Sequence, residues 1–330
     1  MRRTLMIAGA GLIACSSFAL AQVRTIQIEP APLLPAVDKT TQTEDVKFKT
    51  DPTDRMTVPV TISGTGPYRF LVDTGADRTA ISFQLAGRLN FRAAENATLH
   101  SVAGASNVST ANVPSLQLTK KEVRNINAPL LDRGNMGADG ILGTDSLRSQ
   151  RVMFDFAANT MSVVPSAVPD FRDEPGTIVV QGTRRNGRLI LTEATANNKS
   201  IVVVIDTGSQ ISIGNEALRR QLSDSKLLNG GLQQVELQSV TGERINGDYM
   251  FVREIKIGDV GLKNLAVVFA DAHTFKQLKL EKRPALLLGM NAIRAFKKVS
   301  IDFSSRKLRV IVPQESALDV RLASRDTRIP

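Results

Sequence analysis

Two aspartates in matching settings are the residues of this chain best placed to do chemistry. Asp73 and Asp206 each begin an Asp-Thr-Gly tripeptide, and each follows an apolar run typical of a strand. Two carboxylates held close together cannot both ionise cheaply, so such a pair shares one proton. The ionised carboxylate then accepts a proton from a water molecule while the protonated one donates to a carbonyl oxygen. A single tripeptide is equally well explained as a strand-end turn, but the pair predicts one acid–base site made from two halves.

The same further signals follow both aspartates, in the same order. Ser-Val-Ala-Gly at 101–104 follows the first aspartate, and Ser-Val-Thr-Gly at 239–242 follows the second. Ile-Leu-Gly at 141–143 and Leu-Leu-Gly at 287–289 come later, each before a strand-like segment that contains Asp-Phe. This self-similarity indicates an internal repeat, in which each copy is mostly β with two short helices. The helices are expected at 82–89 and 145–149 in the first copy and at 215–222 and 291–298 in the second.

The first residues indicate a secretion signal. Arg2 and Arg3 precede the apolar stretch 5–14, and a small-residue cleavage site follows at Ala21. The stretch is too short to span a bilayer, so no transmembrane segment is expected and the mature protein is placed in a periplasm. Two alternatives concern the same residues. Cleavage before Cys15, after a sequence that resembles a lipobox, would leave a lipid anchor, and the segment 9–14 formally fits a dinucleotide-binding fingerprint that no βαβ unit follows.

Length and composition fix the outline of the domains. A chain of 330 residues with 42% hydrophobic content is large enough for two cores. Segments rich in proline, threonine and charge mark the leader and the junction between the copies. The expected boundaries are a signal peptide at 1–21, a leader at 22–52, an N-terminal lobe at 53–166, a linker at 167–176, a C-terminal lobe at 177–313 and a basic tail at 314–330.

Residue counts exclude several other functions. Cys15 is the only cysteine, so the chain has no internal disulfide, no CxxC pair and no cysteine-based zinc site. His100 and His273 are the only histidines, and neither lies in a metal or nucleophile motif. No cofactor and no metal are therefore expected. The net charge is +10, but the basic residues are dispersed and aromatic residues are few, so no nucleic-acid partner is expected either.

These motifs resemble those of the retropepsin and pepsin types of aspartic peptidase. The run from Asp73 to Asp77 is similar to the active-site loop of the retroviral type, and Asp206 to Ser209 is similar to the pepsin type. The resemblance implies an all-β acid-protease fold with two homologous retropepsin-like β-barrel lobes in a pseudo-twofold arrangement. It also implies an aspartic endopeptidase that acts on proteins or peptides as a monomer with intrachain lobe pairing. Loop-cradling segments are expected at Ile141, Leu142, Gly143, Leu287, Leu288 and Gly289.

Residues around the aspartates are expected to support them. The resemblance implies that Thr74 and Thr207 bond to the opposite loop, and Gly75 and Gly208 lack the Cβ atoms that would keep the loops apart. Ser209 has a hydroxyl group able to donate to the outer oxygen of the second aspartate. Its counterpart Ala76 has none. On this basis Asp206 is expected to be the more often ionised member of the pair.

The repeated Ser-Val-x-Gly segments are expected to be flaps, the hairpins that close over a bound peptide in this family. Glycine at a hairpin tip often has a positive φ, and this is expected for Gly104 and Gly242. Two ordinary surface turns are the alternative interpretation, and neither segment carries the tyrosine of a pepsin flap. The candidate tip residues are Val102, Ala103, Gly104, Val240, Thr241 and Gly242.

Two other hypotheses remain open at this point. The first is an inactive peptide-binding protein that keeps the cleft of this fold and uses it as a receptor. The second pairs each lobe with its copy on another chain, so that activity would need a dimer. Substrate specificity does not follow from these motifs, because pocket walls come from side chains scattered over many strands.

Overall fold

The computed structural model describes residues 24–27, 49–50, 56–118, 121–147, 150–166 and 174–313. The predictions for the signal peptide at 1–21, for a lipid anchor at Cys15 and for the basic tail at 314–330 lie outside these residues, as do most of the leader and of the linker. Two short strands of the leader pair with strands of the two copies: β1 (Arg24–Gln27) pairs with β18 (Val260–Phe269), and β2 (Lys49–Thr50) pairs with β3 (Met56–Ile62).

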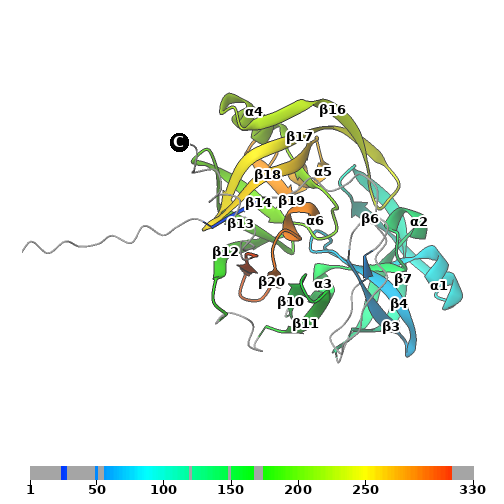
Figure 1. Cartoon of the computed structure of the whole chain (residues 1–330). Helices are drawn as coiled ribbons and strands as arrows, with labels where there is room; N and C mark the ends of the chain where they lie inside the picture. The colour runs from blue at the N-terminus through cyan, green and yellow to red at the C-terminus, as the bar shows by residue number, and fades with distance from the viewer. Residues whose placement is uncertain are drawn as a thin grey trace, which may run out of the picture.

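The first copy of the repeat folds into an eight-stranded sheet with the order β2-β3-β4-β9-β5-β8-β7-β6, which curls so that β3 also pairs with β7 (Figure 1). The end of β4 is apolar throughout, since Phe70, Leu71 and Val72 lie buried between two neighbouring strands. The strands are β3 (Met56–Ile62), β4 (Thr65–Val72), β5 (Ala80–Ser82), β6 (Ala93–His100), β7 (Ala105–Leu118), β8 (Lys121–Leu131) and β9 (Gly140–Leu142).

The second copy repeats this strand order. It runs β13-β14-β19-β15-β18-β17-β16, and an additional pairing of β13 with β17 corresponds to that of β3 with β7. The prediction of two homologous all-β lobes is therefore confirmed. The strands are β13 (Arg188–Ala196), β14 (Lys199–Ile205), β15 (Ser212–Gly214), β16 (Leu228–Gln238), β17 (Arg244–Ile257), β18 (Val260–Phe269) and β19 (Ala285–Leu288).

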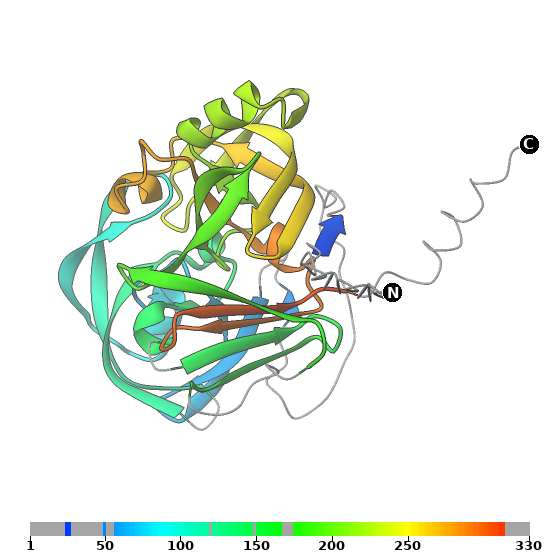
Figure 2. The same cartoon turned by 90° about the vertical axis from the view of Figure 1, so that its left-hand side faces the viewer.

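A third layer joins the lobes beneath the site. The final hairpin of the first copy pairs with the final hairpin of the second (Figure 2). Arg151 lies opposite Asp302 in this pairing. The order β11-β10-β20-β21-β12 continues into the C-terminal lobe through β13, so residues 150–165 belong to a sheet that both copies build. The strands are β10 (Gln150–Asp155), β11 (Thr160–Pro165), β12 (Thr177–Arg185), β20 (Lys298–Asp302) and β21 (Lys307–Ile311).

Short helices occupy equivalent places in the two lobes. The side chains of Ser82 and Asn215 cap the first helix of each copy, each accepting a backbone N–H three residues on. The four expected helices are present with shifted ends, and one more helix in each lobe was not predicted. The helices are α1 (Phe83–Arg88), α2 (Arg133–Met136), α3 (Thr144–Leu147), α4 (Glu216–Asp224), α5 (His273–Gln277) and α6 (Met290–Ile293).

A large apolar core runs through both lobes and the joining sheet, and two smaller clusters lie on either side of the cleft. The cluster in the N-terminal lobe includes Leu131 and Ile141, and that in the C-terminal lobe includes Ile213 and Leu287. Within the described part of the chain, every helix is too short or too polar to span a bilayer. Both lobes thus place rigid, buried strands directly behind the two Asp-Thr-Gly loops.

Candidate active site

Each aspartate follows a buried strand at the centre of its lobe. The backbone N–H of Asp73 donates to the carbonyl of Leu142 at 3.0 Å, and that of Asp206 donates to the carbonyl of Leu288 at 3.1 Å. These acceptors end β9 and β19, which pair in parallel with β4 and β14. The segments predicted to cradle the loops therefore lie where they were expected, one behind each aspartate.

The glycines that end these segments lie against the loops. A Cβ on Gly143 would come within 2.6 Å of backbone atoms of Arg78, and one on Gly289 would do so against Ile211. Side chains of the following helices then brace the loops. Asp145 accepts the backbone N–H of Thr79 at 2.9 Å, and Asn291 accepts that of Ser212 at 2.9 Å. Backbone packing and these two side chains thus fix the position of both loops from behind.

Two threonines lock the loops to each other. The backbone N–H of Thr74 donates to Oγ1 of Thr207 at 3.0 Å, and the reciprocal bond measures 3.1 Å. Each hydroxyl then donates across to the opposite strand, to the carbonyl of Ile205 at 2.9 Å and to that of Val72 at 2.7 Å. Both side chains are buried. These four bonds related by pseudo-twofold symmetry hold the ends of β4 and β14 in a single unit.

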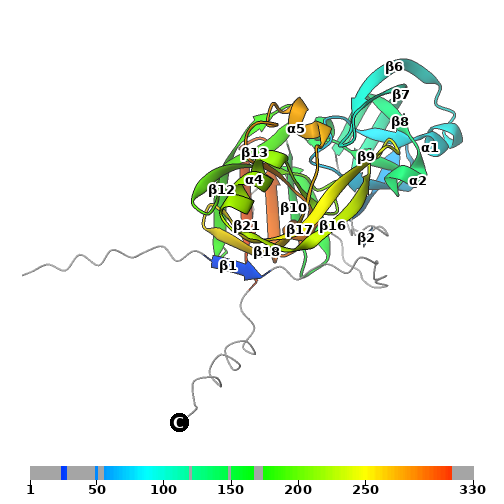
Figure 3. The same ribbon diagram turned by 90° about the horizontal axis from the view of Figure 1, so that it is seen from above.

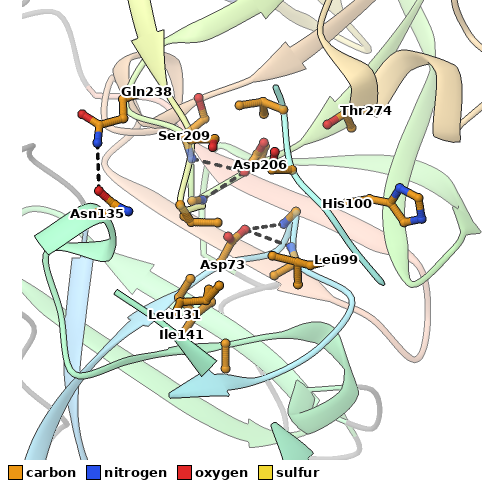
Figure 4. Close-up of a pocket in the computed structure, with 18 of the residues that line it drawn as sticks. Asp73, Leu99, His100, Leu131, Asn135, Ile141, Asp206, Ser209, Gln238 and Thr274 are labelled. Atoms are coloured by element: carbon orange, nitrogen blue, oxygen red, sulfur yellow. Dashed lines mark hydrogen bonds between the residues drawn. The ribbon is translucent and has the colours of Figure 1, made fainter. Parts of the chain in front are cut away.

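The two loops meet so closely that only glycine fits at their contact. A Cβ on Gly75 would lie 2.6 Å from Oδ1 of Asp206, and a Cβ on Gly208 would collide with the carboxylate of Asp73. Each aspartate of one lobe thus lies against the loop of the other. The structure brings Asp73 and Asp206 together at the centre of one cavity, as Figure 4 shows.

The two carboxylates have similar partners but different surroundings. Oδ1 of Asp73 accepts the N–H groups of Gly75 and Ala76 at 2.7 and 3.0 Å. Oδ1 of Asp206 accepts those of Gly208 and Ser209 at 3.1 and 3.2 Å. Asp206 is only 8% exposed, whereas Asp73 is partly exposed. Shorter bonds and greater access to water favour the ionised form of Asp73.

Burial and the neighbouring charge of Asp73 raise the pKa of Asp206 to about 7, although Arg188 and two backbone N–H groups act in the opposite direction. The direction of this shift favours the protonated form of Asp206. The expectation that Asp206 would be the more often ionised member is wrong. Its basis fails too, because the hydroxyl of Ser209 donates to the carbonyl of Ile211 at 2.7 Å, and Ser209 supports Asp206 through its backbone N–H.

Arg188 is a site residue that the sequence interpretation missed. It begins β13 in the C-terminal lobe, is 7% exposed, and donates from Nε to the carbonyl of Gly75 in the opposite loop at 2.6 Å. Its Nη1 lies 3.8 Å from Oδ1 of the exposed Asp77. A signal for it existed, since Arg55 and Arg188 lie the same number of residues before Asp73 and Asp206. Arg55 lies outside the described residues.

The candidate flap segments are the tips of long hairpins, at 101–104 between β6 and β7 and at 239–243 between β16 and β17. Gly242 has the expected positive φ of 88°, but the expectation for Gly104 is wrong. Oγ of Ser101 accepts the N–H groups of Ala103 and Gly104 at 3.1 and 3.2 Å, and this tighter turn needs no left-handed residue.

The two tips cross over to opposite lobes. Val102 packs against the apolar cluster of the C-terminal lobe, and Val240 packs against that of the N-terminal lobe. Figure 2 shows the β6–β7 hairpin reaching towards α5, and Figures 1 and 3 show the β16–β17 hairpin reaching towards α2. Beneath them lies a cavity of about 660 Å³, lined by both loops and both hairpins. Closure of these hairpins over a bound peptide stays a prediction.

Among the residues that the structure describes, no three His, Cys, Asp or Glu side chains are grouped so as to hold a metal ion. At the centre of the cavity, the carboxyl groups of Asp73 and Asp206 each lie against the loop of the opposite lobe.

A family model for aspartyl proteases matches this chain twice, at residues 58–146 and 192–292. Each match contains one Asp-Thr-Gly tripeptide, and together they cover more than half of the chain. The chain therefore belongs to the aspartyl protease family, in a tandem form with two retropepsin-like lobes, which places it among the peptidases. No curated protein matches it in a sequence search.

Proposed function

We propose that this chain is an aspartic endopeptidase whose single catalytic site is formed by Asp73 and Asp206. The observation that carries the proposal is the contact between the two loops, in which a Cβ on the glycine of either loop would collide with the aspartate of the other. One chain supplies both halves, which supports a monomer with intrachain lobe pairing.

The protonation states assign a role to each carboxylate. Ionised Asp73 takes a proton from a water molecule between the two groups as that water attacks the peptide carbonyl carbon. Protonated Asp206 donates its proton to the carbonyl oxygen, so the tetrahedral intermediate carries no net charge. The proton held by Asp73 then passes to the leaving nitrogen, a hydroxyl proton of the intermediate returns to Asp206, and the C–N bond breaks.

The cavity supports a peptide chain as the substrate. The cavity passes beneath two hairpins that reach from opposite lobes. Its lining combines apolar side chains such as Leu131 and Ile213 with polar backbone near the two aspartates, called the dyad from here on. Strand edges at such a cleft pair with an extended segment through main-chain bonds, while side-chain pockets select the residues. An internal segment of a protein fits this shape, so the enzyme is assigned as an endopeptidase.

The proposed location comes from the sequence of the first 21 residues alone. Cleavage after Ala21 would release the enzyme into a periplasm, whereas cleavage before Cys15 would leave it attached to a membrane by lipid. Proteins of the cell envelope are the substrates within reach in either case. Mass spectrometry of the mature N-terminus, purified from membrane and soluble fractions, distinguishes the two forms.

The decisive experiment incubates the mature protein with an unbiased peptide library across acidic and neutral pH. Wild type is expected to cleave internal bonds, while Asp73→Asn and Asp206→Asn each lose at least about a hundredfold in kcat/KM. Size-exclusion chromatography of the active fraction is expected to give a monomer. Binding of peptides without cleavage by wild type, with affinity retained in both variants, would contradict the proposal and indicate a receptor.

A further inference from the structure

The only two histidines of the chain meet across the cleft, although they lie in different lobes. His100 ends β6 at the tip of the N-terminal hairpin, and His273 begins α5 of the C-terminal lobe. Nδ1 of His100 lies 3.0 Å from Nε2 of His273. The ring planes are within 14° of parallel with centroids 5.2 Å apart, so the rings lie edge to edge with these nitrogens facing.

This geometry is that of an N–H···N hydrogen bond, which has a strict protonation requirement. One ring must donate and the other must accept through a free lone pair. The bond forms when both rings are neutral, or when one of them is charged. When both rings are charged no acceptor remains, and two positive charges then lie at hydrogen-bond distance.

Further contacts tie the same hairpin to the same helix. The backbone N–H of His273 donates to the carbonyl of Val102 at 2.8 Å. The side-chain amide of Gln277 lies 3.1 Å from Nδ1 of His100 and 3.3 Å from Nε2 of His273. The tip of the N-terminal hairpin is thus attached to α5 by one backbone bond and by a polar cluster that contains two titratable rings.

Charged groups from three elements act on this cluster. Burial, then the charges of His100 and Lys276, lower the pKa of His273, while Asp271 and Glu243 act in the opposite direction. Lys276 is paired with Asp271 at 2.7 Å. Glu243 comes from the other hairpin and accepts a bond from Ser106 at 2.5 Å. Of these causes, burial and the charge of His100 come with docking of the hairpin, and both make His273 harder to protonate, so proton uptake favours the undocked hairpin.

The C-terminal hairpin docks on the equivalent helix of the other lobe with different chemistry. Nε2 of Gln238 donates to Oδ1 of Asn135 in α2 at 2.9 Å, and a Cβ on Gly242 would lie 2.7 Å from Nδ2 of Asn135. Both side chains are amides, which do not titrate in the physiological range. The two hairpins are thus docked on their helices by different groups, titratable rings on α5 and amides on α2, and the carboxylate of Glu243 in the C-terminal hairpin also bonds Ser101 and Ser106 of the N-terminal hairpin.

The geometry points to His100 and His273 as positioning residues that form a pH-sensitive clasp for the N-terminal hairpin. At neutral pH the clasp holds this hairpin over the dyad, and in mild acid it releases the hairpin while the C-terminal hairpin stays docked. The consequence for catalysis rests on the proposed peptidase function, whereas the release itself does not.

Amide hydrogen exchange tests the release without any substrate. The N–H of His273 is bonded to the N-terminal hairpin, so its protection factor reports docking directly. Protection of this amide is expected to fall roughly two- to tenfold between about pH 7.5 and about pH 5, the change expected from losing one hydrogen bond. Protection factors in the C-terminal hairpin tip, measured in the same samples, are expected to stay constant.

Variants separate titration from packing. His100→Asn and His273→Asn keep a hydrogen-bonding group but cannot take up a proton, so each is expected to abolish the pH response of the amide at position 273. Gln238→Ala is the matched control in the other hairpin and is expected to retain that response. Wild-type protection that does not change with pH, or a pH response that persists in His100→Asn, would overturn the inference.

The same variants carry a catalytic readout. Release of the hairpin is expected to raise KM in acid more than it changes kcat, and both asparagine variants are expected to lose this pH dependence of KM. If the protection of the His273 amide falls in acid but no peptide is cleaved, the peptidase proposal is refuted and the clasp stands. If peptides are cleaved but the protection of this amide does not change with pH, the clasp is refuted and the peptidase proposal stands.

Discussion

The active-site loops of the two lobes have the same pattern of backbone hydrogen bonds, but the surroundings of their carboxylates differ. Thr74 and Thr207 make reciprocal bonds that agree within 0.2 Å, and strand order is the same behind both. Asp206 is nevertheless the more buried aspartate, with the longer bonds to backbone N–H groups and a pKa of about 7. Backbone symmetry brings the carboxylates together, and their unequal burial and unequal backbone bonds favour Asp206 as the one that holds a proton.

Alanine at either loop glycine tests the shared backbone and has the largest expected effect. In Gly75→Ala and Gly208→Ala the new Cβ would occupy the position of the opposite carboxylate. Each change is expected to lower kcat/KM by at least about a hundredfold, since small displacements of catalytic groups have such costs. Gly87→Ala in α1 is the control, because its Cβ would meet no atom within 4 Å. Equal activity of all three variants would contradict the loop contact.

Removing the charge of Arg188 tests how the surroundings of Asp206 set its pKa. Its charge lowers the pKa of Asp206, so Arg188→Gln is expected to raise that pKa further. The shared proton is then lost only at higher pH, and the basic limb of the pH–rate profile is expected to move upward by about one unit. The exposed Arg124→Gln is the control. A limb that stays in place or moves towards acid would exclude this role for Arg188.

Valine substitutions at the two threonines test whether both loops contribute equally to the stability of the protein. Thr74→Val and Thr207→Val each leave a buried N–H and a buried carbonyl without their hydroxyl partner. Each is expected to lower the free energy of unfolding by about 1–3 kcal/mol, measured by urea denaturation. The two losses should agree closely, and a large difference between them would show that the loops are not held equivalently.

The smallest effect is expected for Ser209→Ala. Its hydroxyl donates to the carbonyl of Ile211, while its bond to Asp206 comes from the backbone and survives the substitution. The free energy of unfolding is expected to fall by less than about 1 kcal/mol, and the pH–rate profile should keep both limbs in place. If the acidic limb shifts, the hydroxyl of Ser209 does donate to the carboxylate of Asp206, contrary to this account.

The sequence was sufficient to predict the repeat, the two all-β lobes and the meeting of the aspartates. These features depend on local patterns, since an apolar strand before Asp-Thr-Gly and a later Leu-Gly segment specify the same pairing in both copies. The helices α2 and α5 were missed, because with four and five residues they carry no visible periodicity.

The details that sequence could not supply come from contacts between lobes. Burial of Asp206 depends on the packing of both loops, and the direction of the Ser209 hydroxyl depends on a free carbonyl two residues away. The contact between His100 and His273 was not predicted, because nothing in their sequence context brings a hairpin tip to a distant helix. Arg188 was detectable, but only by comparing the two copies beyond the named motifs.

The measurement that tests the account most directly is a carbon-13 NMR titration of the carboxyl groups of Asp73 and Asp206. Burial of Asp206 and the charge of Asp73 predict that Asp206 takes up a proton near pH 7 while Asp73 remains ionised. Asp73→Asn should lower the midpoint of Asp206, because a neighbouring negative charge is removed. Titration of Asp206 near its ordinary value of 3.8, unaffected by that substitution, would contradict a shared-proton dyad.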